Sequence, residues 1–208
     1  MEPSQILIVV AVAIGAAISI IGAIKKRTTF DRLHGMLAAG DFDGFFKLID
    51  APFTRALYPA YNLMYFKLNA YLIQGDNERA HELLEQLLAH KTAPKQRVDL
   101  VIKAFNIYVG QQDRMGAKAM LKEIEGWTDE NARGVQRECR RIYDIALKGS
   151  SAYIEEMKDE IAQASGTRRG QLEYFLSVQY ENCGDKERAA EYLKRAGEDA
   201  FQIPASDE

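Results

Sequence analysis

Three stretches of this chain share one pattern that decides its fold: YLIQGDNERAHELL (Tyr71–Leu84), YVGQQDRMGAKAML (Tyr108–Leu121) and YENCGDKERAAEYL (Tyr180–Leu193). Each begins with tyrosine, has alanine nine positions later and ends with leucine. Two of them carry Gly-Asp in between, where glycine favours a left-handed helix stop and aspartate caps the next helix. The pattern predicts helical hairpins in which the tyrosine ends the first helix and the alanine lets the second helix approach closely.

The pattern recurs at a regular spacing. With Tyr143 included, successive tyrosines are 37, 35 and 37 residues apart (108−71, 143−108 and 180−143). The alanines that follow them are Ala80, Ala117, Ala152 and Ala189. Such a hairpin buries its apolar face only by stacking on its neighbours, so the spacing predicts an all-α chain of stacked repeats.

The Y-x3-G-D-x3-A-x3-L core of the first and third stretches resembles the middle of the tetratricopeptide repeat (TPR). The tryptophan and glycine that the family places in its first helix are replaced in both. Two further units are degenerate: Met36–Ile49 keeps Gly40-Asp41 but has Phe45 at the alanine position, and the unit of Tyr143 lacks Gly-Asp. The resemblance covers residues 28–200 and implies a right-handed, TPR-like α-solenoid of about five helical hairpins.

The residues Ile6–Ile24 form an uncharged apolar run of nineteen residues. As a helix this run reaches about 28 Å, close to the thickness of the hydrocarbon core of a bilayer. Lys25, Lys26 and Arg27 follow it instead of preceding it, which favours an uncleaved signal anchor and places the repeats on the cytoplasmic side of the cell membrane. The predicted parts are an extracytoplasmic leader (1–5), a single-pass transmembrane helix (6–24), a basic flank and linker (25–29), the repeat domain (30–200) and a tail (201–208).

Small residues recur every four positions in the apolar run, at Ala11, Gly15, Ser19 and Ala23. Such a stripe lets two helices pack closely and predicts a homodimer through the membrane segment. The alternative is chance, because eight of the nineteen residues are glycine, alanine or serine.

Known chemical motifs are missing from the sequence. No arrangement of histidine, cysteine or carboxylates has metal-ligand spacing, and no nucleophile or phosphate-binding motif is present, so we expect no enzyme, no metal and no cofactor. The net charge of −3 shows no basic stripe for nucleic acid. Cys139 and Cys183 are expected to be reduced thiols, with a disulfide between them as the alternative. The acidic residues of 155–160, opposite Ile154, Met157 and Ile161, predict a solvated helix face.

The TPR resemblance also implies a ligand groove along the first helices of the hairpins. The position two before the tyrosine maps to His34, Asn69, Asn106, Arg141 and Val178, and the position one turn earlier to Phe30, Tyr65, Ile102, Arg137 and Tyr174. From these sets the predicted peptide-binding groove is His34, Tyr65, Asn69, Asn106, Arg137, Arg141 and Tyr174. Arg137 and Arg141, one turn apart, would hold a carboxylate by forked hydrogen bonds, which suits an acidic or C-terminal peptide. The alternative is that these residues are polar only because they are exposed.

These features predict a membrane-tethered adaptor or scaffold without catalytic activity, bound to the lipid bilayer by its N-terminal helix and to a protein or peptide partner by the groove. Two alternatives stay open. One is a self-assembling structural membrane protein. The other reverses the topology and makes the chain a secretion-associated chaperone outside the membrane.

Overall fold

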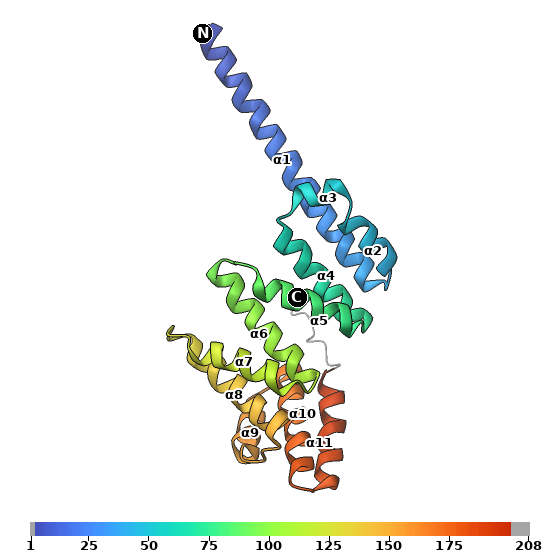
Figure 1. Ribbon diagram of the computed structural model, residues 1–208, viewed down its shortest axis with the longest axis vertical. Coiled ribbons are helices and arrows are strands. Elements are labelled where there is room, and N and C mark those ends of the chain that lie inside the picture. Colours follow the sequence, from blue (N-terminus) through green and yellow to red (C-terminus); the bar gives the residue numbers. More distant parts are fainter. Residues whose placement is uncertain (1–2, 201–208) are drawn as a thin grey trace. The chain divides into compact units, whose positions relative to one another are not determined.

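A computed structural model describes the backbone of residues 3–200 and the side chains of residues 21–198. Over residues 3–200 the chain forms eleven helices and no strand, which confirms the all-α prediction (Figure 1). The helices are α1 (Pro3–Ala38), α2 (Phe42–Ile49), α3 (Pro52–Leu57), α4 (Ala60–Gln74), α5 (Asn77–Ala89), α6 (Pro94–Gly110), α7 (Arg114–Glu125), α8 (Ala132–Lys148), α9 (Ile154–Ile161), α10 (Gly166–Asn182) and α11 (Lys186–Ala200). They divide into two compact units, residues 1–91 and 92–208, so the predicted repeat domain extends over both.

The predicted hairpin turns are confirmed in detail. Gly75 follows α4 in the left-handed conformation, with a φ of 76°, and the Asp76 carboxylate accepts a hydrogen bond from the Arg79 N–H at the start of α5. One main-chain bond, from an aspartate N–H to the carbonyl oxygen five residues earlier, closes four turns at 2.8–2.9 Å: Asp41 to Met36, Asp76 to Tyr71, Asp113 to Tyr108 and Asp185 to Tyr180. These bonds satisfy carbonyls at the helix ends that would otherwise lack a partner.

The turn between α8 and α9 is longer than the other turns. Its closing bond runs from the Ser150 N–H to the Asp144 carbonyl oxygen, six residues back instead of five, and Tyr153 is the N-cap of α9. Asp144, not Tyr143, is therefore equivalent to the tyrosine of the other units. Ala152, predicted to lie on the second helix, is an exposed residue of the turn. Met157 takes the alanine position and is fully buried.

The core of unit 1 (residues 1–91) lies where α2 and α3 pack on α1 and α4 packs on α2. Phe45, at the alanine position of its degenerate hairpin, is fully buried there, and so is Leu33 of α1. Large side chains of this kind each stabilise a fold by about 1.5–3 kcal/mol when buried. The buried residues of this cluster are Leu33, Phe45, Ile49, Tyr58, Leu63 and Ala70.

Unit 2 (residues 92–208) contains three hairpins in a regular packing order. The first helices contact one another, α6 with α8 and α8 with α10, and each second helix contacts the following first helix, α7 with α8 and α9 with α10. The α10–α11 hairpin packs along its length (Figure 1). One hydrophobic cluster of unit 2 lies where α8, α9 and α10 meet. Its buried residues are Ile145, Met157, Leu172, Leu176 and Tyr180.

No helix in the part of the chain with described side chains is long and apolar enough to cross a membrane. The predicted span, Ile6–Ile24, lies mostly outside those residues, and so do Ala11, Gly15 and Ser19 of the predicted packing face. Ala23 is within them and exposed. The predicted leader (1–5) and tail (201–208) also lie outside the described side chains.

Candidate functional site

A concavity of about 740 Å³ in unit 2 is bounded by α6, α8, α10 and α11. We call it the groove. Its lining residues are Asn106, Glu138, Ile142, Thr167, Arg168, Gly170, Gln171, Tyr174, Phe175, Leu193, Ala196 and Gly197. A second hollow of about 310 Å³ continues it between α6 and α8 and shares Asn106, Glu138 and Ile142 with it.

The groove has an apolar floor with exposed aromatic and aliphatic side chains. The exposed fractions of Tyr174 and Leu193 are 49% and 54%, although both are large apolar residues. The Tyr174 ring packs edge-on against Phe175, with 5.5 Å between the ring centroids. This ring contact leaves about half of the Tyr174 side chain exposed. A ligand that covers it gains the free energy of burying that surface.

Two exposed side-chain amides lie on the same surface. Asn106 of α6 and Gln171 of α10 both line the groove, and neither amide hydrogen-bonds within the described part of the chain. Each amide has two N–H donors and one carbonyl acceptor, which match the main chain of an extended peptide. The groove therefore combines an apolar contact area with free hydrogen-bonding groups.

Of the residues predicted for ligand binding, Asn106 and Tyr174 come together in the groove. Arg137 is exposed on α8 but does not line it, and Arg141 is buried, with 3% exposed. The longer turn after α8 explains this difference. Alignment on Asp144 instead of Tyr143 moves the groove positions of α8 by one residue, to Glu138 and Ile142, which line the groove.

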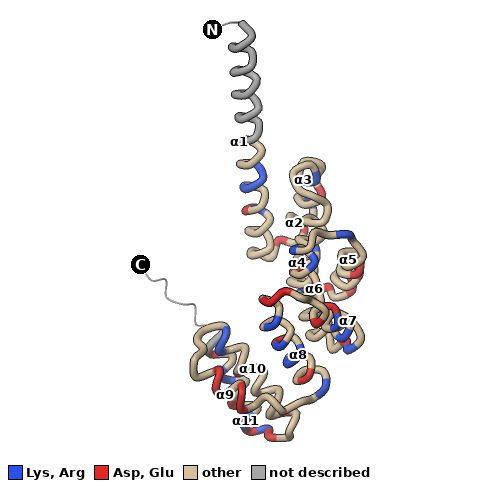
Figure 2. The backbone as a smooth tube through the Cα atoms, turned by 90° about the vertical axis from the view of Figure 1, so that its left-hand side faces the viewer, with Lys and Arg blue, Asp and Glu red and all other residues tan. Residues whose placement is uncertain are grey.

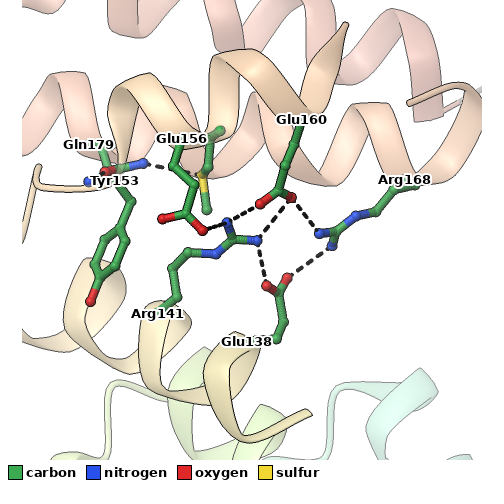
Figure 3. Close-up of polar contacts among 8 residues, drawn as sticks. Glu138, Arg141, Tyr153, Glu156, Glu160, Arg168 and Gln179 are labelled. Carbon is green, nitrogen blue, oxygen red and sulfur yellow. Dashed lines mark hydrogen bonds and ion pairs between the residues drawn. The ribbon is translucent and has the colours of Figure 1, made fainter. Parts of the chain in front are cut away.

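Arg141 is the centre of an ion-pair network among α8, α9 and α10 (Figure 3). Its guanidinium donates to Glu160 at 2.5 Å, to Glu156 at 3.3 Å and to Glu138. Arg168 of α10 bridges the same two carboxylates, Glu138 at 2.9 Å and Glu160 at 3.0 Å. The forked geometry satisfies several lone pairs at once, which makes such pairs among the stronger ones in proteins.

The network corrects one expectation. Arg141 already holds carboxylates of its own chain and is not part of the predicted carboxylate clamp. On α9, Glu155, Glu156 and Asp159 are exposed, as predicted for a solvated face. Glu156 and the half-buried Glu160 also pair with Arg141. Figure 2 shows the acidic residues along α9. The hydrogen bond from Arg141 is the main reason that the pKa of Glu160 lies below its usual value. The network thus fixes α9 and α10 against α8, the helix that contributes Glu138 and Ile142 to the groove.

Both cysteines are free thiols, as expected. Cys139 borders the smaller hollow beside Glu138, but burial raises the pKa of its thiol to about 11. Because only the thiolate is nucleophilic, this cysteine is unreactive near neutral pH. It acts as a small apolar residue of α8.

The other predicted groove residues, His34, Tyr65 and Asn69, belong to unit 1. His34 is exposed on α1, and its ring lies 4.1 Å from the Phe30 ring and 5.6 Å from the Phe66 ring, measured between centroids. Tyr65 and Asn69 are half-buried on α4. His34 is thus engaged in an aromatic cluster of unit 1.

Sequence reasoning missed several groove residues: Glu138, Ile142, Arg168, Gln171, Phe175 and Leu193. Gln171 lies three residues before the predicted position Tyr174, and Phe175 lies one residue after it. No signal in the sequence separated these two residues from their neighbours. Glu138 and Ile142 line the groove because the turn after α8 is longer than the other turns. The sequence does not show this length, because the turn lacks the Gly-Asp pair.

Comparison with protein-family models, with curated proteins and with solved structures finds no match to this chain. Among the residues with described side chains, no group of three histidine, cysteine or carboxylate residues could hold a metal ion.

Proposed function

We propose that this chain is a membrane-tethered adaptor that binds a segment of a partner protein in the groove of unit 2. The observation that carries the proposal is the groove itself. Its volume of about 740 Å³ lies in the range of ligand sites, and it presents exposed Tyr174 and Leu193 beside the free amides of Asn106 and Gln171. Apolar anchors flanked by hydrogen-bonding groups are typical of peptide recognition.

The packing order of unit 2 supports a TPR-like arrangement. In a stacked array of hairpins, the first helices lie side by side and line one surface, while the second helices fill the opposite layer. The contacts of α6 with α8 and of α8 with α10 follow this order. The three first helices supply most of the groove residues, and α11 closes one side.

The chemistry of the groove favours a partner segment with a large apolar side chain over one recognised mainly by its carboxylate. The floor offers Tyr174, Phe175 and Leu193 for an apolar anchor. The cation that lines it, Arg168, is already paired with Glu138 and Glu160. Arg137 is exposed on α8 but does not line the groove.

The tether is the apolar run Ile6–Ile24 followed by Lys25, Lys26 and Arg27. Its length and its flanking charges support a helix that crosses the membrane once, with the repeats on the cytoplasmic side. A tether of this kind raises the local concentration of the groove near membrane-bound partners, so moderate affinity is sufficient for binding.

Site-specific photo-crosslinking in cells tests the proposal. A photoreactive phenylalanine analogue replaces Tyr174 in the groove or, as a control, Met115, whose side chain is 79% exposed on α7. We expect adducts with another protein from position 174 and not from position 115. Equal adducts from both positions, or none from position 174, would contradict the groove as the binding surface.

A further inference from the structure

We propose that α3 lies on the membrane surface, with Phe53 among the lipids at the interface and the nearby cations against anionic headgroups. We call Lys25, Lys26, Arg27 and Arg55 the basic collar. The inference rests on the proposed tether and adds a second, specific contact between unit 1 and the bilayer.

The first observation is an exposed apolar surface beside the basic collar. Phe53 on α3 is 48% exposed, and Ile21 and Ile24 on α1 are 52% and 57% exposed. Ile21 and Ile24 are the last isoleucines of the apolar run that begins at Ile6, so this surface continues the predicted membrane segment. Exposed large apolar residues next to each other usually mark a contact surface.

The second observation is that α3 is held in place against α1 (Figure 1). The Tyr58 hydroxyl, just after α3, donates a hydrogen bond to the Lys26 carbonyl oxygen. Thr54 is fully buried and donates to the Leu48 carbonyl oxygen at 2.7 Å. With Thr54 directed inward, the neighbouring residues Phe53 and Arg55 face outward, and this orientation requires no rearrangement.

Two lysines of the basic collar lie beside aromatic rings on α3 and just after it. The Lys25 ammonium is 5.4 Å from the centre of the Phe53 ring, and the Lys26 ammonium is 5.4 Å from the centre of the Tyr58 ring. All four cations are exposed, and they include the band of lysine and arginine on the described part of α1 (Figure 2). Two carboxylates lie near this surface, against the four cations. Asp50 is shared between Arg55 at 3.6 Å and Lys67 at 2.7 Å, and Asp31 of α1 is close enough to Tyr58 to act on it electrostatically. The surface is therefore positive overall.

An anionic bilayer fits this combination better than a protein partner. Aromatic rings sit at the boundary between headgroups and acyl chains, while lysine and arginine extend their charges toward lipid phosphates. Each cation near an anionic membrane strengthens association by about 1 kcal/mol, roughly a fivefold factor per residue. The contact should therefore depend on anionic lipid and weaken as the salt concentration rises.

Tryptophan quenching in reconstituted vesicles tests this contact. The full chain carries Trp127→Phe, which removes its only native tryptophan, together with Phe53→Trp. The matched control has Ile73→Trp in the same background. Ile73 is 60% exposed near the end of α4, about 20 Å along that helix from the residues that follow α3. The vesicles are brominated phosphatidylcholine with or without phosphatidylglycerol, and flotation records whether each protein is membrane-bound.

We expect the tryptophan at position 53 to be quenched strongly in vesicles that contain phosphatidylglycerol and less in vesicles of phosphatidylcholine alone, with position 73 unquenched in both. If the protein floats with the vesicles but position 53 is unquenched, the inference is wrong and the tether stands. A blue-shifted but unquenched emission at position 53 overturns it in favour of a protein contact, such as a second copy. Equal quenching at both positions also overturns it. Failure to float contradicts the tether and, with it, the inference.

Discussion

Replacing Arg141 with methionine removes the central cation of the network but keeps most of the volume of the side chain. Glu138, Glu156 and Glu160 then face one another, with Arg168 as the remaining cation of the network drawn in Figure 3. Loss of one partner from a fully buried ion pair costs about 3–5 kcal/mol. The three carboxylates are 29%, 48% and 35% exposed, so water can partly solvate them. We therefore expect the free energy of unfolding of unit 2 to fall by about 2–3 kcal/mol.

Arg137→Met is a matched control, because it makes the same substitution one turn earlier on α8 at an exposed position. We expect this variant to change the free energy of unfolding by less than about 0.5 kcal/mol. The assay is urea unfolding of the full chain in detergent, followed by the fluorescence of Trp127, which lies in unit 2 and is the only tryptophan. The reasoning is refuted if Arg141→Met destabilises unit 2 no more than Arg137→Met does.

Acid, a thiol reagent and substitutions of glycine probe other parts of the structure. The pKa of Glu160 is lower in the folded state than its ordinary value of 4.5, chiefly because of the hydrogen bond from Arg141. Ionised Glu160 therefore stabilises the fold above pH 4.5, and this stabilisation is lost as the pH falls through the folded-state pKa. In the same urea assay the stability of unit 2 should decline in acid, and Glu160→Gln should flatten that decline. An aromatic disulfide reagent should modify exposed Cys183 rapidly, and buried Cys139, with its pKa raised to about 11, only on unfolding; equal rates would contradict the described burial. Gly184→Ala should lower the free energy of unfolding by about 1 kcal/mol, because the φ of Gly184 is 84°. Gly110→Ala in α6 should be neutral or stabilising, because an added Cβ there meets nothing within 4 Å. Equal effects of the two substitutions would count against the left-handed turn.

The hairpins could be predicted because their signals are local. Tyrosine, glycine and aspartate within six residues specify a helix end, a left-handed turn and a cap, and these groups interact with their near neighbours in the chain. The turns after α4 and α10 follow this prediction, with Gly75 and Gly184 in the left-handed conformation.

The positions of Arg137 and Arg141 outside the groove could not be predicted from the sequence, for two physical reasons. The connection between α8 and α9 has five residues (149–153), whereas the connections of the other hairpins have two or three. It also lacks the Gly-Asp pair that marks the turn, so alignment on Tyr143 placed the groove positions of α8 one residue out of register. The carboxylates that pair with Arg141 lie 15 and 19 residues away on α9, and their distance from it depends on how the helices pack. Asn106 and Tyr174, whose hairpins have shorter turns, both line the groove.

Peptide titration shows whether the groove of unit 2 binds a partner segment. The peptide is the segment of the partner that crosslinks to position 174, titrated into the full chain. Tyr174 is half-exposed, so covering the rest of its ring contributes about 1.5 kcal/mol to binding. We predict saturable binding that Tyr174→Ala weakens by about tenfold and Met115→Ala leaves unchanged. Equal affinity for the wild-type chain and the Tyr174→Ala variant would contradict the account.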